Sequence, residues 1–378
     1  MAGSIKQVIE ATTTPLASIF GSGFLVIVPI LAGAVGPYSV FAMAGICALA
    51  YAVGSVIRFN IERAEPVLVS HPPEIILALE RSSDLALVLA YVISVSLYLH
   101  ILSAFVLGGL GIDNAINENM LTTGVIAVIM VIGVAKGLKP LEILERWALY
   151  ITLVIIVLLA IGFGVYDFNA WRTTAGITLP SATDHSAWTI LTIVAGTLIV
   201  VQGFETTRYL GGEFNAEVRI SASRWSQIVS TAVYVVFVAL ALPLVYLLNG
   251  QYDDNGLIKL AGIASGLLVV PLIVAAALSQ FSAAVADTMA ATGNMEEVTH
   301  AELKAKFGYI IVGTGAIALT WSANTYEIIA LASRAFAFYY MLQCLVAIGL
   351  SNSAGRRTFM AIIAATLAFI TIFAVPAS

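Results

Sequence analysis

Two glycine-interrupted stretches decide the fold: Phe20-Gly21-Ser22-Gly23-Phe24 and Gln202-Gly203-Phe204-Glu205-Thr206. Each lies in the middle of a segment that is otherwise apolar enough to cross a membrane. A broken backbone cannot face lipid, because an unpaired N–H or C=O group is costly in hydrocarbon. Such breaks are tolerated inside protein or against a cavity, and a matching pair indicates a site built at membrane depth.

The whole chain is too apolar for a water-soluble domain. Of its 378 residues, 60% are hydrophobic and 10% are charged, and the mean hydropathy is +0.99. This composition predicts a polytopic membrane protein. Cys47 and Cys344 lie far apart in apolar runs, so no disulfide framework is expected. The polar stretch 1–15 does not resemble a cleavable signal peptide, and we expect the first apolar run to be retained.

About eleven apolar segments have the length of roughly 20 residues that a membrane-crossing helix needs. We therefore predict an all-α fold in which residues 1–378 form a single transmembrane domain. The predicted spans are 16–36, 39–57, 84–110, 121–136, 142–166, 188–210, 226–248, 263–292, 307–323, 326–350 and 357–376.

The basic residues predict the orientation. With the N-terminus in the cytoplasm, 14 of the 17 Lys and Arg residues fall in inner segments, Arg172 and Lys259 fall outside, and Arg334 lies within a span. Inner segments of membrane proteins carry such an excess of positive charge. The asymmetry supports both this orientation and the number of spans. The inner residues are Lys6, Arg58, Arg63, Arg81, Lys136, Lys139, Arg146, Arg208, Arg219, Arg224, Lys304, Lys306, Arg356 and Arg357.

The two breaks fall in spans one and six. Because an odd number of helices inverts the second copy of a repeat, this spacing predicts a five-plus-five inverted repeat with broken helices one and six. The first repeat covers about 14–166, the second about 188–350, and an extra helix follows at about 357–376. Alternatively, either glycine pair alone could be a small-residue packing surface, which is common in membrane helices.

Several motifs resemble one family. The stretch from Ile19 to Phe24 resembles the opening helix of the amino acid–polyamine–organocation (APC) superfamily. Gly203-Phe204-Glu205, followed by Glu213-Phe214-Asn215, resembles its sixth helix and the loop after it, and Gly137-Leu138-Lys139 resembles the start of its fifth. The resemblance implies the LeuT-type fold and secondary active transport. The chain departs from the family where some proton-coupled members carry a lysine, a place that Thr152 takes here.

The chemistry of the breaks suggests a site with two ends. Unwinding in span one would expose backbone N–H groups at the start of a half-helix, which favours an anionic group. In span six the half-helix ends near Gln202, and its carbonyls suit an ammonium group or a cation. Glu205 could accept a substrate amine, bond to unwound backbone or carry a proton. Arg208 could pair with Glu205, or it could lie near the inner end of the span and stay separate. The predicted solute-binding residues are Gly21, Ser22, Gly23, Tyr98, Gln202, Gly203, Glu205 and, as an aromatic wall, Phe204.

Span eight supplies the predicted ion-coupling residues. Ser279 and Ser282 are three residues apart and share a helix face. The resemblance implies that hydroxyls here hold a sodium ion together with carbonyls of span one. Asp287 could bind an ion, carry a proton or neutralise Arg334, and Glu205 is the fourth member of this set. For Arg334 we expect a buried carboxylate partner, with Glu205, Asp287 and Glu327 as candidates.

The sequence therefore predicts a secondary active, ion-coupled transporter of a small organic solute, either an amino acid or an amine, that works by alternating access. Transport of an inorganic ion is the alternative, and an intramembrane enzyme using His100 is a remote one. We expect no enzymatic activity, no cofactor, a proton or sodium as coupling ion, and no nucleic-acid partner. The expected partners are the solute and the lipid bilayer, and the expected location is the plasma (inner) membrane.

Overall fold

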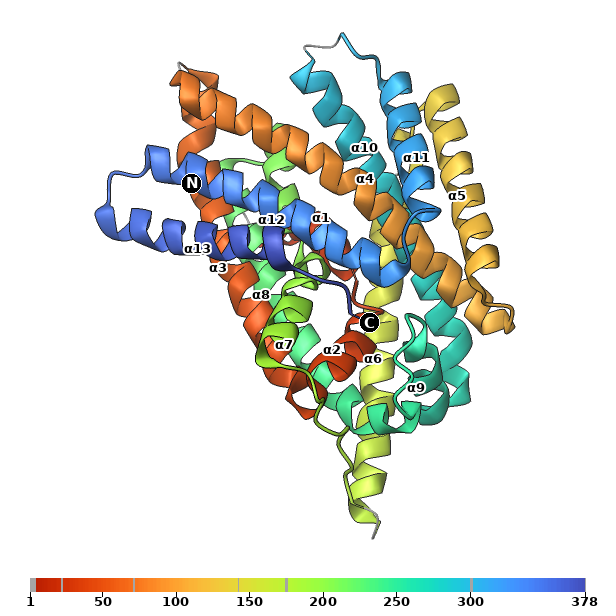
Figure 1. Cartoon of the computed structure of the whole chain (residues 1–378). Helices are drawn as coiled ribbons and strands as arrows, with labels where there is room; N and C mark the ends of the chain where they lie inside the picture. The colour runs from red at the N-terminus through yellow and green to blue at the C-terminus, as the bar shows by residue number, and fades with distance from the viewer. Residues whose placement is uncertain are drawn as a thin grey trace.

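The computed structural model describes residues 5–21, 23–70, 72–141, 143–173, 176–299 and 302–377. This part of the chain is all-helical, as the sequence predicts (Figure 1). Its α-helices are α1 (Ile5–Gly21), α2 (Ile27–Val35), α3 (Ser39–Val69), α4 (Glu74–Leu110), α5 (Ala115–Lys136), α6 (Ile143–Arg172), α7 (Ala187–Ala195), α8 (Ala216–Val245), α9 (Gly256–Ala264), α10 (Val269–Val298), α11 (Ala305–Thr320), α12 (Thr325–Leu350) and α13 (Ala354–Phe373).

Eight segments of the described chain are long and apolar enough to cross a membrane, and α11 is a shorter apolar helix. The two broken spans complete the eleven that the sequence predicts. Span one consists of α1 and α2. Span six consists of α7 and two 3₁₀ helices, η3 (Leu198–Val201) and η4 (Phe204–Gly212).

The helices extend beyond the predicted limits at the basic face. For example, α3 continues to Val69 and α4 begins at Glu74, whereas the predicted spans end at 57 and begin at 84. Hydropathy marks only the part of a helix that lies in hydrocarbon, so charged turns beyond it are missed. The sequence prediction also missed α9, a nine-residue helix between spans seven and eight.

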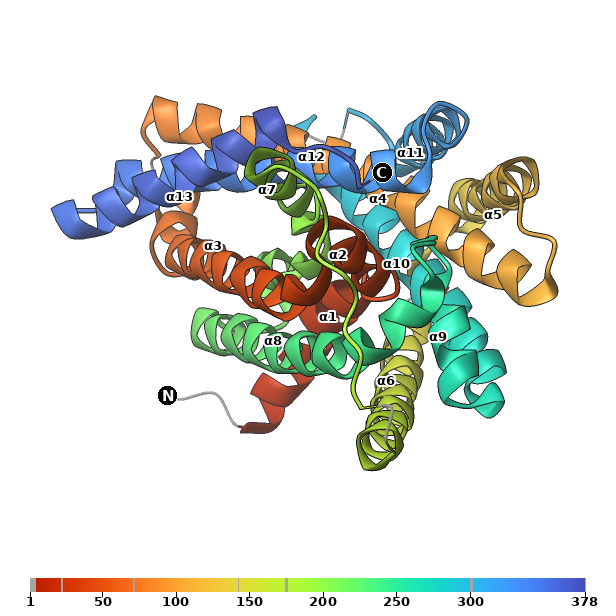
Figure 2. The same ribbon diagram turned by 60° about the horizontal axis from the view of Figure 1, so that its bottom comes forward.

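The helices form two groups around the breaks. In one group α3 and α1 pack against α8, and η4 packs against α1 and α8. In the other, α4 packs extensively against α10, and α5 packs against α4 and α11. In the view of Figure 2, α1 and α2 lie centrally, with α3 and α8 on one side and α4 and α10 on the other. The two breaks thus lie where the groups meet.

Candidate functional site

The first break lies between α1 and α2, and its described residues are 23–26. A Cβ atom at Gly21 would lie 2.9 Å from the Cβ of Ala283 on α10. Gly23 has a φ of +146°, and a Cβ there would lie 2.8 Å from Cγ2 of Val200 on η3. The two glycines therefore permit close contact with span eight and span six. Ser22, the third residue predicted here, lies outside the described residues.

The second break is held by Glu205. Gly203 has a φ of +125°, in the left-handed region that favours glycine. Its backbone N–H donates to Oε2 of Glu205 over 2.9 Å, and the hydroxyl of Tyr340 on α12 donates to the same oxygen over 2.6 Å. The Glu205 side chain is fully buried, and its other oxygen, Oε1, has no hydrogen-bond partner among the described residues.

The two breaks touch each other. A Cβ atom at Gly203 would lie 2.6 Å from Oγ of Ser18 and 2.7 Å from the backbone nitrogen of Ile19 on α1. The hydroxyl of Tyr234 on α8 lies 3.0 Å from the carbonyl oxygen of Ile19 and 2.7 Å from that of Val200. The Tyr234 hydroxyl is thus within hydrogen-bond distance of one carbonyl oxygen beside each break. The two irregular segments therefore form a single unit.

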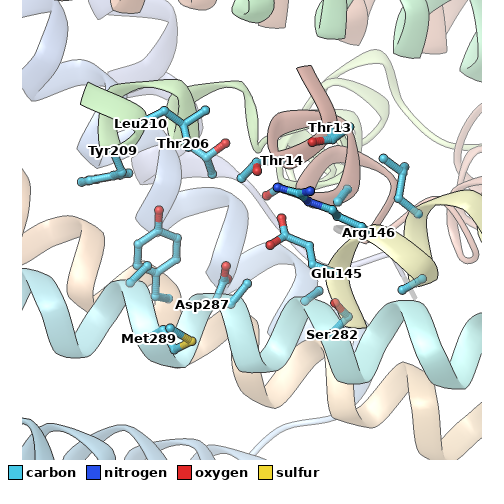
Figure 3. A pocket seen from close by; sticks show the side chains of 18 of the residues that line it. Thr13, Thr14, Glu145, Arg146, Thr206, Tyr209, Leu210, Ser282, Asp287 and Met289 are labelled. Carbon is cyan, nitrogen blue, oxygen red and sulfur yellow. The ribbon is translucent and has the colours of Figure 1, made fainter. Parts of the chain in front are cut away.

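A cavity of about 520 Å³ lies beside this unit. Figure 3 shows side chains converging on it from α1, α6, η4 and α10. Its buried part is formed by Phe20, Tyr91 and Asp287, and its mouth by the exposed residues Glu213 and Glu297. The other lining residues are Thr13, Thr14, Ala17, Ser18, Glu145, Arg146, Ala148, Leu149, Thr152, Thr206, Tyr209, Leu210, Ser279, Ser282, Ala283, Ala286, Met289, Ala290, Gly293 and Asn294.

The mouth faces the end of the molecule that the basic residues predict to be cytoplasmic. Arg146 near the start of α6 and Glu297 near the end of α10 line it. The opposite end is closed by contacts of the 249–255 loop. Asp254 accepts a hydrogen bond from Oγ1 of Thr325 over 2.7 Å, and the Tyr326 hydroxyl donates to the carbonyl of Tyr252. The cavity is thus open at the basic end of the molecule, while the loop contacts close the opposite end.

Three of the predicted ion-coupling residues line the cavity: Ser279, Ser282 and Asp287. Asp287 is 5% exposed, and its Oδ2 has no hydrogen-bond partner among the described residues. Because an unpaired buried carboxylate oxygen is costly, it marks the place where a cation or a hydrogen-bond donor would be stabilised most. Thr152 also lines the cavity, and its buried hydroxyl is likewise unpaired within the described chain.

The other predicted residues lie behind the cavity wall. Gly21, Gly23, Gly203 and Glu205 are not among its lining residues. Phe204, the expected aromatic wall, is buried and stacks on the ring of Tyr340 at a centroid distance of 5.2 Å. The structure therefore gives these residues contacts within the protein, and their contact with a solute stays a prediction.

Tyr98 and Gln202 form a further link behind the wall. Nε2 of Gln202 donates to the hydroxyl of Tyr98 on α4 over 2.9 Å. Both side chains are buried. The break in span six is therefore connected to α4 through this tyrosine.

The two arginines have different outcomes. Of the two alternatives for Arg208, the structure favours the one in which it stays separate from Glu205, because Arg208 donates to Oε1 of Glu80 over 2.6 Å. The expectation for Arg334 is wrong. Arg334 has no carboxylate partner in the described chain. It is exposed, and it donates to the carbonyl oxygens of Thr371 (2.8 Å) and Ile372 (3.1 Å) at the end of α13. A cation at a helix C-terminus satisfies carbonyls that have no helical partner and complements the helix dipole.

The sequence analysis missed a charged network near the basic end. Glu65 of α3 accepts two hydrogen bonds from Arg219 of α8, at 2.9 and 2.6 Å. Arg219 also donates to the carbonyl of Arg208, which joins it to the Arg208–Glu80 pair. Glu80 in turn accepts a hydrogen bond from Gln343 of α12. In a hydropathy profile these residues cannot be distinguished from solvated loop charges, because the profile contains no information about side-chain partners.

Comparison with known proteins agrees with this architecture. A family model for APC superfamily transporters matches residues 4–375. The chain is a member of the APC superfamily. It is also similar to a protein from Aquifex aeolicus (strain VF5) that is described only as uncharacterized. The two are 40% identical over 348 residues, which cover 90% of this chain and 84% of that protein.

Solved structures show the same fold. Two mutant forms of a manganese transporter from Eremococcus coleocola match with TM-scores of 0.56 and 0.57. Each match covers 97% of this chain and 85% of that protein at 11% sequence identity. At this identity the likeness establishes the LeuT-like fold and not a shared substrate.

Proposed function

We propose that this superfamily member is a secondary active transporter that moves a small organic solute, an amino acid or an amine, by alternating access. The observation that carries the proposal is the cavity of about 520 Å³, which has the volume of a small-molecule site. It lies against both broken helices and contains Asp287, whose unpaired oxygen suits an ammonium group.

The form of the cavity supports alternating access. It is open toward the face predicted to be cytoplasmic and closed at the other end by the contacts of Asp254 and Tyr326. A carrier needs a second conformation in which this closure opens and the inner mouth shuts. Broken helices suit such a change, because a break can act as a hinge between half-helices.

Ion coupling is part of the proposal. Ser279 lines the cavity next to the first break, since a Cβ at Gly21 would lie 4.0 Å from both its carbonyl oxygen and its Oγ. Hydroxyl and carbonyl oxygens are suitable ligands for sodium, and Asp287 or Glu205 could instead carry a proton. Uptake measured with and without a sodium gradient, at two pH values, distinguishes the two coupling ions.

The direct test is uptake into proteoliposomes. The purified protein is reconstituted, an ion gradient is imposed, and radiolabelled amino acids, amines and simple ions are screened. The proposal predicts accumulation of at least one amino acid or amine above its external concentration. Absence of gradient-driven uptake across all amino acids and amines would contradict it.

Transport of an inorganic cation is the second candidate, and its support is the fold shared with the manganese transporter. The side chains offer less support. Within the described ranges, no three His, Cys, Asp or Glu side chains lie together in a group that could hold a metal ion. Uptake of radiolabelled Mn²⁺ that amino acids and amines fail to inhibit would favour this candidate over the first.

A further inference from the structure

The charges in the cavity wall are mainly of one sign. Among the described lining residues four are acidic and one, Arg146, is basic. Arg146 is exposed at the mouth, where salt and water screen its charge. A cleft lined by one sign of charge concentrates ions of the opposite sign, so this cavity favours cations over anions. The four acids are Glu145, Glu213, Asp287 and Glu297.

Asp287 is the buried member of this acidic set. Its side chain is 5% exposed, and its Oδ2 has no hydrogen-bond partner among the described residues. Figure 3 shows the side chain pointing from α10 into the cavity. Glu297 at the mouth follows ten residues later on the same helix, so Asp287 lies about 15 Å further inside along the helix axis. The cavity therefore has a fixed negative charge deep within it, where a cationic group would be stabilised most.

The wall around Asp287 suits an apolar body. Ala283 and Ala290 lie about one helical turn on either side of Asp287, and their small side chains leave room beside the carboxylate. Phe20 of α1 and Leu149 of α6 are buried and add apolar surface from other helices. Binding pockets for small organic molecules combine such apolar walls with a few polar groups that orient the ligand.

A carboxylate on the solute would find no comparable partner here. Within the described part of the wall no buried side chain is basic. The glycines of the first break, Gly21 and Gly23, are not among the lining residues, and the N–H of Gly203 in the second break already donates to Glu205. In an α-amino acid the carboxylate and the amine share one carbon atom, so an amine bound to Asp287 would bring two negative charges close together. Like charges placed in this way weaken binding strongly.

We infer that the solute is an organic amine with an apolar body and no carboxylate, and that Asp287 is the residue that selects it over the corresponding amino acid. The inference rests on the proposed function and narrows its solute to one of the two classes. The ammonium group donates to Oδ2 of Asp287, and the apolar body packs against Phe20 and Leu149.

Binding of matched compounds tests this preference. Dissociation constants are measured by calorimetry on the purified full-length protein for three pairs that differ only by the carboxylate: phenylethylamine and phenylalanine, tryptamine and tryptophan, and 3-methylbutylamine and leucine. In at least one pair the amine should bind at least about ten-fold more tightly than the amino acid. Phenylalanine methyl ester is larger than phenylalanine but lacks the negative charge. It should bind more like phenylethylamine, which separates charge from size.

Asp287→Asn and Glu297→Gln form a matched pair of variants, because each removes one negative charge and keeps the shape of the side chain. Asp287→Asn should weaken the amine by at least about ten-fold and leave the amino acid no weaker, so that the preference disappears. Glu297→Gln, at the exposed mouth, should keep the preference. If Asp287→Asn does not fold, the methyl ester comparison on the wild-type protein decides alone.

The outcomes separate this inference from the transport proposal. An amino acid that binds as tightly as its amine in every pair that binds would overturn the inference, and so would the absence of binding by all three amines. Gradient-driven uptake of an amino acid without uptake of any amine would overturn the inference and support transport. Amine binding that depends on Asp287, without gradient-driven uptake of any solute, would overturn the transport proposal and leave the preference for amines in place.

Discussion

At the scale of single residues, Glu205 shows how an acid at membrane depth can be stabilised without a cation. One oxygen accepts two hydrogen bonds, from the Gly203 backbone and from the Tyr340 hydroxyl. The sequence indicates that Glu205 is important, because a buried carboxylate beside a glycine break is rare in lipid. It cannot identify Tyr340 as the partner, because that residue is 135 positions away along the chain.

Replacing Glu205 tests its role as a clamp. Glu205→Leu would leave the Gly203 N–H and the Tyr340 hydroxyl buried and unpaired, at a cost of about 1–3 kcal/mol for each group. We expect a clear loss of thermal stability in detergent. Glu205→Gln keeps an acceptor oxygen and should lose much less. Equal stability of wild type and Glu205→Leu would show that the break does not depend on this side chain.

At the scale of elements, the charged network ties the basic ends of four helical segments together. Arg208 of η4 and Glu80 of α4 form its buried pair, with each side chain 11% exposed. The charge pattern predicts correctly that both residues belong to the basic end. It cannot predict that they pair, because 128 residues separate them and the fold alone brings them together.

Breaking this pair should destabilise the basic end of the molecule. Arg208→Met leaves Glu80 buried without its cation, which costs on the order of 3 kcal/mol, and Arg208→Met/Glu80→Met should recover part of the loss. Denaturant titration in detergent measures the free energy of unfolding of the single and the double variant. The exposed pair of Lys259 and Asp253, about half exposed on each side, is the matched control, and Lys259→Met should cost under about 1 kcal/mol. If Lys259→Met and Arg208→Met lose similar amounts of unfolding free energy, the structural role of the network is refuted.

At the scale of the whole molecule, the sequence predicts the number of spans, the place of both breaks and the family. Hydropathy and the distribution of positive charge are enough for the spans, because the bilayer imposes both patterns on any chain. The breaks come from the glycine pairs, and the family comes from the motifs around them. The cavity is different. Among the described residues of the predicted site, Ser279, Ser282 and Asp287 line it, since its shape depends on how the two helix groups pack in three dimensions.

The closed end of the molecule, which the basic residues predict to be external, should respond to pH. Burial raises the pKa of Asp254 above its ordinary range, against the opposing effect of the hydrogen bond from Thr325. The closed form therefore binds a proton more tightly than an open form in which Asp254 is solvated, so closure strengthens as pH falls through the raised pKa and weakens above it.

Cysteine labelling from outside measures this effect. Ile30→Cys, buried behind Tyr252, should become less reactive as the external pH is lowered. Asp254→Asn should leave only the dependence that ionisation of the thiol itself gives, whereas Asp253→Asn, at the exposed neighbouring carboxylate, should keep the larger dependence of the wild type. A pH profile that is unchanged in Asp254→Asn would assign the effect to another group.

The central claim is that the paired breaks and the cavity beside them carry a solute across the membrane. Gradient-driven uptake by Gly203→Leu tests it most directly. The added side chain would meet Ser18 and the Ile19 backbone at a strained φ of +125°, whereas Gly212→Ala, the control on the same segment, meets no atom within 4 Å. We predict that wild type and Gly212→Ala accumulate the solute and that folded, membrane-inserted Gly203→Leu does not. Uptake by Gly203→Leu at the wild-type rate would contradict the claim.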